Sequence, residues 1–197
     1  MMFAPMPSPL GHSLAGLTVG WLSEPAFSRR PSRWSDTLTP WAAWCAVVAA
    51  APDADLLFPH FHRTATHSVT ATVSVLIITA IVTGKVTRRP AWGFAIALAA
   101  GHATHLLLDW LGTDRFPPPG LQVLWPFSGK YFYSGIDLFP PVERRLWRPE
   151  ALGVNAIAAF WELAIMGPVA AAAWFVRQRR RRWPASDTPP QREAASP

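Results

Sequence analysis

The sequence carries histidines and aspartates in several short motifs, a pattern typical of a metal site. They occur in GHS at 11–13, PDAD at 52–55, HFHRTATHS at 60–68 and HATHLLLD at 102–109. Histidine and carboxylate ligands without cysteine suit zinc, manganese or iron, and we expect zinc first. The set is large enough for one ion or for two. The candidate metal ligands are His12, Asp53, Asp55, His62, His67, His105 and Asp109.

The motif HATHLLLD predicts a helix face that presents ligands. His102, His105 and Asp109 are spaced i, i+3 and i+7, which places all three on one face of a helix. Asp109 also follows His105 by four residues, so it can bind the same ion or orient the imidazole. The alternative is that these are core histidines whose hydrogen bonds are satisfied within the protein.

The two earlier motifs predict ligands on loops and at a helix start. The D-x-D pair in PDAD can offer oxygen atoms to a cation, although aspartates are also ordinary turn residues after a helix. His62 and His67 are five residues apart and cannot share one helix face, so we expect His62 in a loop and His67 near a helix start. Arg63 can clamp an anionic group such as a phosphate, with a solvated loop arginine as the alternative.

Glu162 stands apart because it lies in the middle of an apolar segment, with Asn155 seven residues earlier on the same helix face. A carboxylate in that position should face the interior of a helical bundle. It can support the metal ligands, accept a proton, or act as a buried acid that is hydrogen-bonded to Asn155 or to another neighbour.

The segments that must position these residues predict an all-α integral membrane protein of about five helices. Half of the 197 residues are apolar and 15% are charged, and the length fits one domain. A bilayer core needs about 20 helical residues. Segments 91–111 and 151–176 reach that length and 68–84 is near the short limit, whereas 9–22 and 38–51 are shorter and either span a thinned bilayer or pack inside the bundle.

The remaining parts of the chain predict a loop region and a tail. Residues 112–150 are rich in proline, glycine and aromatic residues, so we expect irregular structure folded over the outer face. Residues 1–183 should form one helical membrane domain, and 184–197 should be a disordered tail.

The single cysteine, Cys45, excludes a cysteine-ligated metal within one chain. The net charge of +6 comes from short basic clumps between apolar runs, a pattern that disfavours nucleic-acid binding.

Those basic clumps predict an orientation. They lie at 29–33, 85–89 and 177–182, and five crossings place all three on one side of the membrane, which the positive-inside bias makes the cytoplasm. The candidate ligands then fall on the opposite, outer side. The basic residues within 112–150 count against this orientation: Arg115, Lys130, Arg144, Arg145 and Arg148.

The motifs, in this order, resemble the YdjM-like family of bacterial inner-membrane metal-dependent hydrolases. The matching features are GH at 11–12, PDAD at 52–55, HRTATHS at 62–68, GHATHLLLDWLGTD at 101–114 and GLQVLWPF at 120–127. That family looks like a distant relative of the zinc phospholipase C and zinc nuclease group. The resemblance therefore implies a zinc-dependent phosphoester hydrolase.

The chain also departs from that family's pattern. The family commonly has a histidine after its D-x-D pair, whereas Asp55 is followed by Leu56, Leu57 and Phe58. His102 stands where the family usually has a residue that does not bind metal. The resemblance therefore ranks His102 below His105 as a metal ligand. His102, like Glu162, can support the ligands without binding the ion.

Together these observations predict a membrane-bound metal-dependent hydrolase that acts on a phosphoester, such as a phospholipid or a lipid-linked phosphate. Asp53 or Asp55 would serve as metal ligand and general base, and Arg63 would hold the anionic substrate. Two alternatives remain. One is a non-catalytic metal-ion carrier or sensor, and the other is a haem protein with His67 and His105 as axial ligands, which leaves the aspartates without a role.

Overall fold

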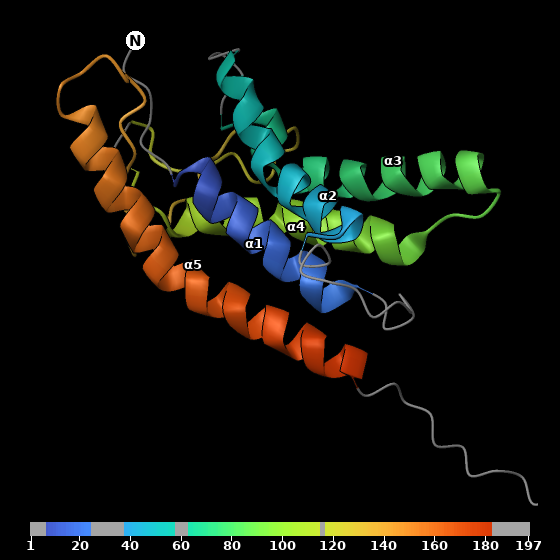
Figure 1. Ribbon diagram of the computed structural model, residues 1–197. Helices are drawn as coiled ribbons and strands as arrows, with labels where there is room; N and C mark the ends of the chain where they lie inside the picture. Colours follow the sequence, from blue (N-terminus) through green and yellow to red (C-terminus); the bar gives the residue numbers. More distant parts are fainter. Residues whose placement is uncertain (1–6, 25–37, 58–62, 115–116, 183–197) are drawn as a thin grey trace, which may run out of the picture.

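The computed structural model describes residues 7–24, 38–57, 63–114 and 117–182. These parts of the chain form a helical bundle without β-strands, which confirms the predicted all-α class (Figure 1). The elements are α1 (Pro9–Ser23), α2 (Pro40–Ala50), the 3-10 helices η2 (Ala51–Leu57) and η3 (Ala65–His67), α3 (Val69–Thr87), α4 (Trp92–Leu111) and α5 (Ala151–Arg182). The predicted tail, 184–197, lies outside the described residues.

Short polar residues set the helix starts at the end of the bundle that bears the histidines. Ser8 caps α1 by accepting a hydrogen bond from the Leu10 amide at 3.2 Å, with Pro9 as the first helical residue. Ser68 caps α3 in the same way by accepting from the Ala71 amide at 3.1 Å. A serine oxygen satisfies an amide that has no partner in the first turn, so the start of each helix is well defined.

The helices alternate in direction, so α1, α3 and α5 run parallel to one another. Glu162 of α5 bonds to Ser8 at the start of α1, and Arg181 pairs with Glu24 just beyond the end of α1 at 3.3 Å. Helix α1 also packs against α2 and α4, whereas α3 packs mainly on α4. The chain thus returns to the same end of the bundle after every second helix (Figure 1).

Three helices, α3, α4 and α5, are long and apolar enough to cross a membrane. Helix α3 is the most exposed of them, and its large apolar side chains, such as Ile77 and Ile81, are about half exposed. An exposed apolar surface of this extent is expected where lipid surrounds a helix. Helices α1, with 15 residues, and α2, with 11, fall short of the roughly 20 that a full span needs. Helix α1 packs against α2, α4 and α5, and α2 packs against α1 and α4.

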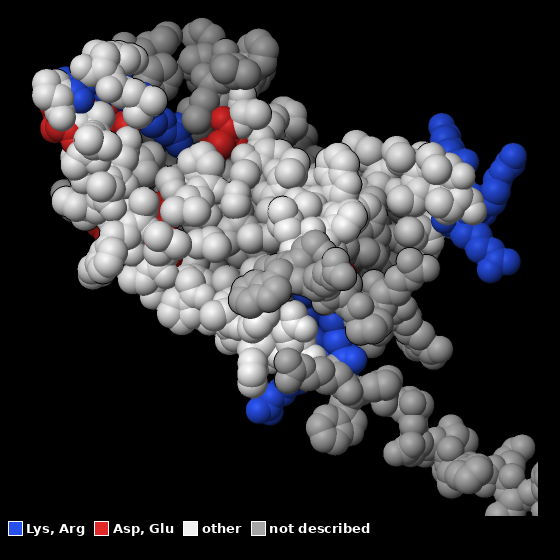
Figure 2. Space-filling model, in the orientation of Figure 1, with Lys and Arg blue, Asp and Glu red and all other residues white. Residues whose placement is uncertain are grey.

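Basic residues gather at the end of the bundle away from the helix starts of α1, α3 and α5. Lys85 and Arg88 lie at the end of α3, and the last turns of α5 contain five arginines: Arg177, Arg179, Arg180, Arg181 and Arg182. Figure 2 shows Lys and Arg side chains at the extremities of the molecule, with a broad uncharged surface between them. The predicted clump at 29–33 lies outside the described residues.

Residues 117–150 form irregular structure over the end of the bundle where α4 stops and α3 begins. The Val69 amide donates to the Val123 carbonyl at 2.9 Å, and the Leu138 amide donates to the Leu111 carbonyl at 2.8 Å. Phe139, which is 1% exposed, is buried among residues of α1, α4 and α5. The loop is therefore tied by its backbone and by its side chains to the helix ends that carry His67 and Asp109.

Close packing of α1 on α2 brings two of the candidate ligand segments together. A Cβ atom added at Gly16 would lie 2.4 Å from the Cys45 carbonyl oxygen and 2.6 Å from the Ala46 Cα. Neither of these backbone atoms can move aside without a shift of α2. The absence of a side chain at Gly16 therefore sets the α1–α2 distance, as small residues do in other membrane bundles.

We expect Gly16→Ala to lower the stability of the protein by about 1–3 kcal/mol, because the added methyl group overpacks the α1–α2 contact. The measurement is the melting temperature of the detergent-purified protein. Gly153→Ala in α5 is the matched control, since no atom of the described residues is found within 4 Å of its added Cβ and alanine is the better helix former. Equal melting temperatures for the two variants would contradict this account of the contact.

Candidate metal centre

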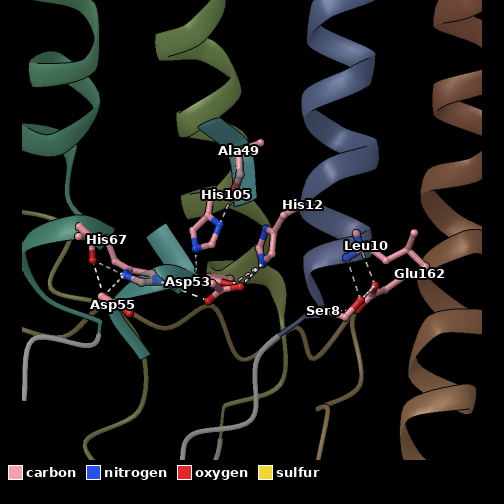
Figure 3. Close-up of polar contacts among 12 residues, drawn as sticks. Ser8, Leu10, His12, Ala49, Asp53, Asp55, His67, His105 and Glu162 are labelled. Carbon is pink, nitrogen blue, oxygen red and sulfur yellow. Dashed lines mark hydrogen bonds and ion pairs between the residues drawn. The ribbon is translucent and has the colours of Figure 1, made fainter. Parts of the chain in front are cut away.

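Five candidate ligands from four separate segments meet at one end of the bundle (Figure 3). They form two overlapping groups in which nitrogen and oxygen atoms all lie within 4.8 Å of one another. One group is His12, Asp53 and His105, and the other is His67, His105 and Asp109. Helix α1 supplies His12, η2 supplies Asp53, η3 supplies His67, and α4 supplies His105 and Asp109. The alternation of helix directions is what brings these segments to the same end.

Asp109 is the centre of the cluster. Its carboxylate oxygens lie 3.3 Å from Nε2 of His12, 3.4 Å from Nε2 of His67 and 3.0 Å from Nε2 of His105. The imidazole rings of His12 and His105 are stacked, with their centroids 3.9 Å apart. The three imidazoles therefore present the same nitrogen, Nε2, to a single carboxylate.

Asp53 closes the cluster on the side of the 112–150 loop. Its two oxygens lie 3.9 Å from Nε2 of His12 and 4.0 Å from Nε2 of His67. On its other side, a guanidinium nitrogen of Arg144 lies 3.7 Å from Oδ1 of Asp53. Asp53 is thus shared between the buried histidines and a basic residue of the loop.

The backbone sets the ring orientation of His105. Its Nδ1 lies 2.7 Å from the carbonyl oxygen of Ala49. A carbonyl can only accept, so Nδ1 carries the proton and a neutral ring directs the Nε2 lone pair at Asp109. Two lone pairs facing each other at 3.0 Å repel, which a proton or a cation between them would relieve. Metal-binding histidines are commonly held in this way through their second nitrogen.

The donor atoms of the cluster fit a cation because they are buried and make no hydrogen bonds within the described residues. These atoms are both ring nitrogens of His12, Nε2 of His105 and the carboxylate oxygens of Asp53 and Asp109. His12 and His105 are fully buried, and Asp109 is 3% exposed. Buried carboxylates and imidazoles without partners are costly. Donor separations of about 3–4 Å are those of ligands around one ion at about 2.1 Å from each.

Asp55 lies beside His67 rather than among the atoms that face Asp109. Its Oδ2 is 3.2 Å from Nδ1 of His67 and also accepts a hydrogen bond from the hydroxyl of Thr66. Burial is the largest influence on His67 and lowers the pKa of its imidazole, against the opposing effect of the Asp55 contact. A lowered pKa keeps the ring neutral, the form that binds metal.

Glu162 supports the cluster through the start of α1. Its carboxylate accepts hydrogen bonds from the Ser8 amide at 2.5 Å, from the Ser8 hydroxyl and from the Gly11 amide at 2.9 Å. The side chain is fully buried, as expected for a carboxylate inside a bundle. Figure 3 shows it next to Ser8 and Leu10 at the start of α1, and its third partner, Gly11, directly precedes His12. Glu162 is therefore a helix anchor, and its predicted neighbour Asn155 bonds elsewhere.

Arg63 does not face the cluster. Its guanidinium donates to Asp114 at 2.5 Å and to the Pro118 carbonyl at 2.5 Å, and the residue is 5% exposed. Asp114 also accepts from the Gly120 amide at 2.7 Å. These bonds fix the loop over the helix ends, and they occupy the guanidinium that was predicted to hold substrate. Asp114 lies in the GHATHLLLDWLGTD motif, but sequence reasoning assigned it no role.

The two remaining candidates lie outside the cluster or outside the described residues. His102 is buried and its Nδ1 lies 2.8 Å from the Thr72 hydroxyl, so it joins α4 to α3. It shares a helix face with His105 but is one turn farther from Asp109. His62 lies outside the described residues. Among the described residues, Asp55 and Thr66 contact Nδ1 of His67.

The residue that sequence reasoning missed is Arg144. The sequence treats it as one of several basic residues that count against the predicted orientation, and no motif singles it out. Its neighbours Arg145 and Arg148 are paired locally, with Glu143 at 2.7 Å and Glu150 at 3.0 Å, whereas Arg144 reaches Asp53. An available signal was the order of charges in VERRLWRPE, where three arginines have only two acidic neighbours.

Asn155 of α5 holds the backbone next to Arg144. Its side-chain oxygen accepts from the Glu143 amide at 2.7 Å, and its side-chain nitrogen donates to the Glu143 carbonyl at 2.9 Å. Glu162 and Asn155 of α5 thus have separate roles: Glu162 anchors the helix that carries His12, and Asn155 anchors the loop that carries Arg144.

Comparison with known proteins identifies a family. The family model described as "YdjM inner membrane protein" matches residues 6–183, which span all five helices and the loop. No curated protein and no solved structure matches the chain.

Proposed function

Because the chain belongs to the YdjM inner membrane protein family, we propose that its buried histidine and aspartate cluster is the metal centre of a membrane-bound hydrolase that acts on phosphoesters. One observation carries the proposal. Ring nitrogens of His12 and His105 and the carboxylates of Asp53 and Asp109 converge without hydrogen bonds of their own in the described residues. Nε2 of His67 faces the same carboxylate of Asp109 at 3.4 Å. A cluster that is only structural would be expected to satisfy these groups internally.

The cluster suits one ion better than two. Both ligand groups include His105, and its Nδ1 is occupied by the Ala49 carbonyl, so only Nε2 is free to bind. Nitrogen and oxygen ligands favour zinc, with manganese and iron as alternatives. The ligands would be His12, His67, His105 and Asp109, with Asp53 as a further ligand or as an acid-base group. Asp55 would keep Nδ1 of His67 protonated and so direct its Nε2 inward.

When bound, a divalent ion in such a site polarises a phosphoester and activates water for attack on it. Side chains of the protein would then accept the proton of the attacking water and balance the negative charge of the phosphate. Asp53 is placed to accept the proton of the attacking water, because its oxygens face both the cluster and the loop. Arg144, beside Asp53, would compensate the negative charge of a phosphate.

The positions of the charged residues support a site at the outer surface of the membrane. The cluster lies at one end of the bundle, and the described basic residues of α3 and α5 lie at the opposite end. The positive-inside bias then makes the basic end cytoplasmic. A hydrolase site at the outer end would meet lipid phosphate groups at the level of the bilayer surface.

The same arrangement disfavours a metal-ion carrier. A carrier needs polar groups through the bilayer midplane. Within the described residues, the histidines and aspartates of the cluster all lie at one end, and Glu162 is occupied as an anchor of α1. No series of polar groups leads from the cluster through the described part of the bundle toward Arg177 and Glu24 at the other end.

The test is metal analysis of the full-length protein in detergent, together with phosphate release from a phosphomonoester. We expect about one zinc per chain, loss of both metal and hydrolysis after treatment with a chelator, and recovery of both after zinc is added. Hydrolysis that survives complete removal of metal would refute the proposal. Zinc uptake into proteoliposomes without hydrolysis of any phosphoester would favour the carrier instead.

A further inference from the structure

An apolar pocket opens next to the cluster, between the start of α5 and the 112–150 loop. Its volume is about 510 Å³, which is within the range of small-molecule sites. Asp53 forms part of its wall on the side of the cluster. Val142, Leu146, Trp147 and Ala159 are among the residues that make the wall largely apolar. The pocket therefore joins a surface suited to a hydrocarbon chain to a carboxylate of the metal centre.

Arg144 is the basic residue of this wall, and its hydrogen-bonding capacity is not used up. Its Nη1 is buried and has no hydrogen-bond partner in the described residues, and its Nη2 lies 3.7 Å from Asp53. Arg145 is held by both oxygens of Glu143 at 2.8 and 2.7 Å. A buried guanidinium nitrogen without a partner is costly, and a phosphate oxygen is its best complement.

The rim of the pocket is suited to the membrane surface. Leu146 is 74% exposed and Trp147 is 78% exposed. Large apolar side chains with this exposure are typical of segments that enter the interfacial region of a bilayer, and tryptophan is enriched there. A hydrocarbon chain can reach the pocket from that region without crossing bulk water.

We propose that this pocket binds the hydrocarbon chain of a lipid whose head is a terminal phosphate, and that Arg144 holds that phosphate against Asp53. The proposal rests on the proposed hydrolase function and narrows its substrate class to phosphate monoesters of long-chain alcohols. Asn155 is the positioning residue for Arg144, because it fixes the backbone of Glu143 through two hydrogen bonds. Specificity then comes from two sources, the apolar wall and one arginine.

The experiment measures binding without turnover. The full-length protein is stripped of metal with a chelator, placed in phosphatidylcholine nanodiscs and titrated with radiolabelled dodecyl phosphate, with subtraction of binding to empty nanodiscs. Inorganic phosphate is titrated in parallel. We expect saturable binding of one dodecyl phosphate per chain, and inorganic phosphate should compete only at a concentration at least about 10-fold higher, since it cannot use the apolar wall.

Two variants test the two parts of the site, each with a matched control. Arg144→Gln should weaken binding of dodecyl phosphate about 10- to 100-fold, the equivalent of one hydrogen bond to a charged group, whereas Arg148→Gln, at an exposed pair with Glu150, should not. Ala159→Phe should fill the pocket and weaken binding of dodecyl phosphate but not of inorganic phosphate. Ala156→Phe, exposed on the same helix and outside the pocket wall, should bind normally.

Several outcomes would overturn the inference. They are unchanged affinity in Arg144→Gln, equal affinities for Ala159→Phe and Ala156→Phe, or inorganic phosphate competing as well as dodecyl phosphate. The measurement uses metal-free protein, so it separates the two proposals. If the protein binds lipid phosphate but the zinc-loaded protein hydrolyses no phosphoester, the hydrolase proposal is refuted and the pocket assignment stands. If the protein hydrolyses phosphoesters but Arg144→Gln binds dodecyl phosphate normally, the pocket assignment is refuted and the hydrolase proposal stands.

Discussion

Replacing Asp109 by alanine should abolish metal binding. This carboxylate lies within 3.4 Å of Nε2 of His12, His67 and His105, so its removal takes away one ligand and the group that faces the other three. Loss of a residue that only orients a ligand costs about 10- to 100-fold in metal affinity. Loss of the central ligand should cost more than that, and hydrolysis should fall with it.

The measurement is the zinc content and the zinc affinity of the purified variant, determined with a competing chelator. Asp109→Asn keeps the shape of the side chain and removes its charge, so it tests whether the effect is electrostatic. Asp55→Ala is the contrasting variant. Asp55 contacts Nδ1 of His67 from outside the cluster, so the zinc affinity of Asp55→Ala should fall about 10- to 100-fold without being lost. Wild-type zinc content in folded Asp109→Ala would refute the metal centre.

The second large effect is expected for Glu162→Ala, which should destabilise the whole bundle. The substitution leaves the Ser8 amide, the Ser8 hydroxyl and the Gly11 amide without their acceptor. The Gly11 bond is buried and the two Ser8 bonds are partly buried, and a fully buried donor left unsatisfied costs about 1–3 kcal/mol. The total is about 3 kcal/mol or more, and the melting temperature should fall by about 10 °C. Zinc affinity should also decrease, because the turn that carries His12 loses its anchor.

Glu150→Ala is the matched control for this effect, since Glu150 is exposed and its pair with Arg148 contributes little. Glu162→Gln should lie between the two, because an amide still accepts through its oxygen but turns a donor group toward the Ser8 and Gly11 amides. If Glu162→Ala melts at the wild-type temperature and retains its zinc affinity, the anchoring role is wrong.

The helices could be predicted because each one has a pattern that is local in sequence. Apolar segments of about 20 residues predicted α3, α4 and α5. The alternating directions of all five helices explain why the ligands meet at a single end of the bundle. The i, i+3, i+7 spacing predicted a helix face shared by His102, His105 and Asp109. It did not predict that His102 bonds to Thr72 of α3 instead of facing the cluster, because that depends on how α3 packs on α4.

The site was less predictable where a role depends on a distant partner. Arg63 stands in the HRTATHS motif and was expected to bind substrate, yet Asp114 and Pro118 hold it in place. Arg144 stands in no motif and reaches the cluster. Both outcomes follow from the path of the 112–150 loop, which is irregular and therefore leaves no periodic pattern in the sequence.

The contacts between α1 and α5 also bear on the order in which the protein can mature during synthesis. Helix α1 leaves the ribosome before α5, but Glu162 of α5 holds its first turn, and Glu24, just beyond its end, pairs with Arg181. The turn that leads to His12 therefore gains its anchor only after α5 has been made.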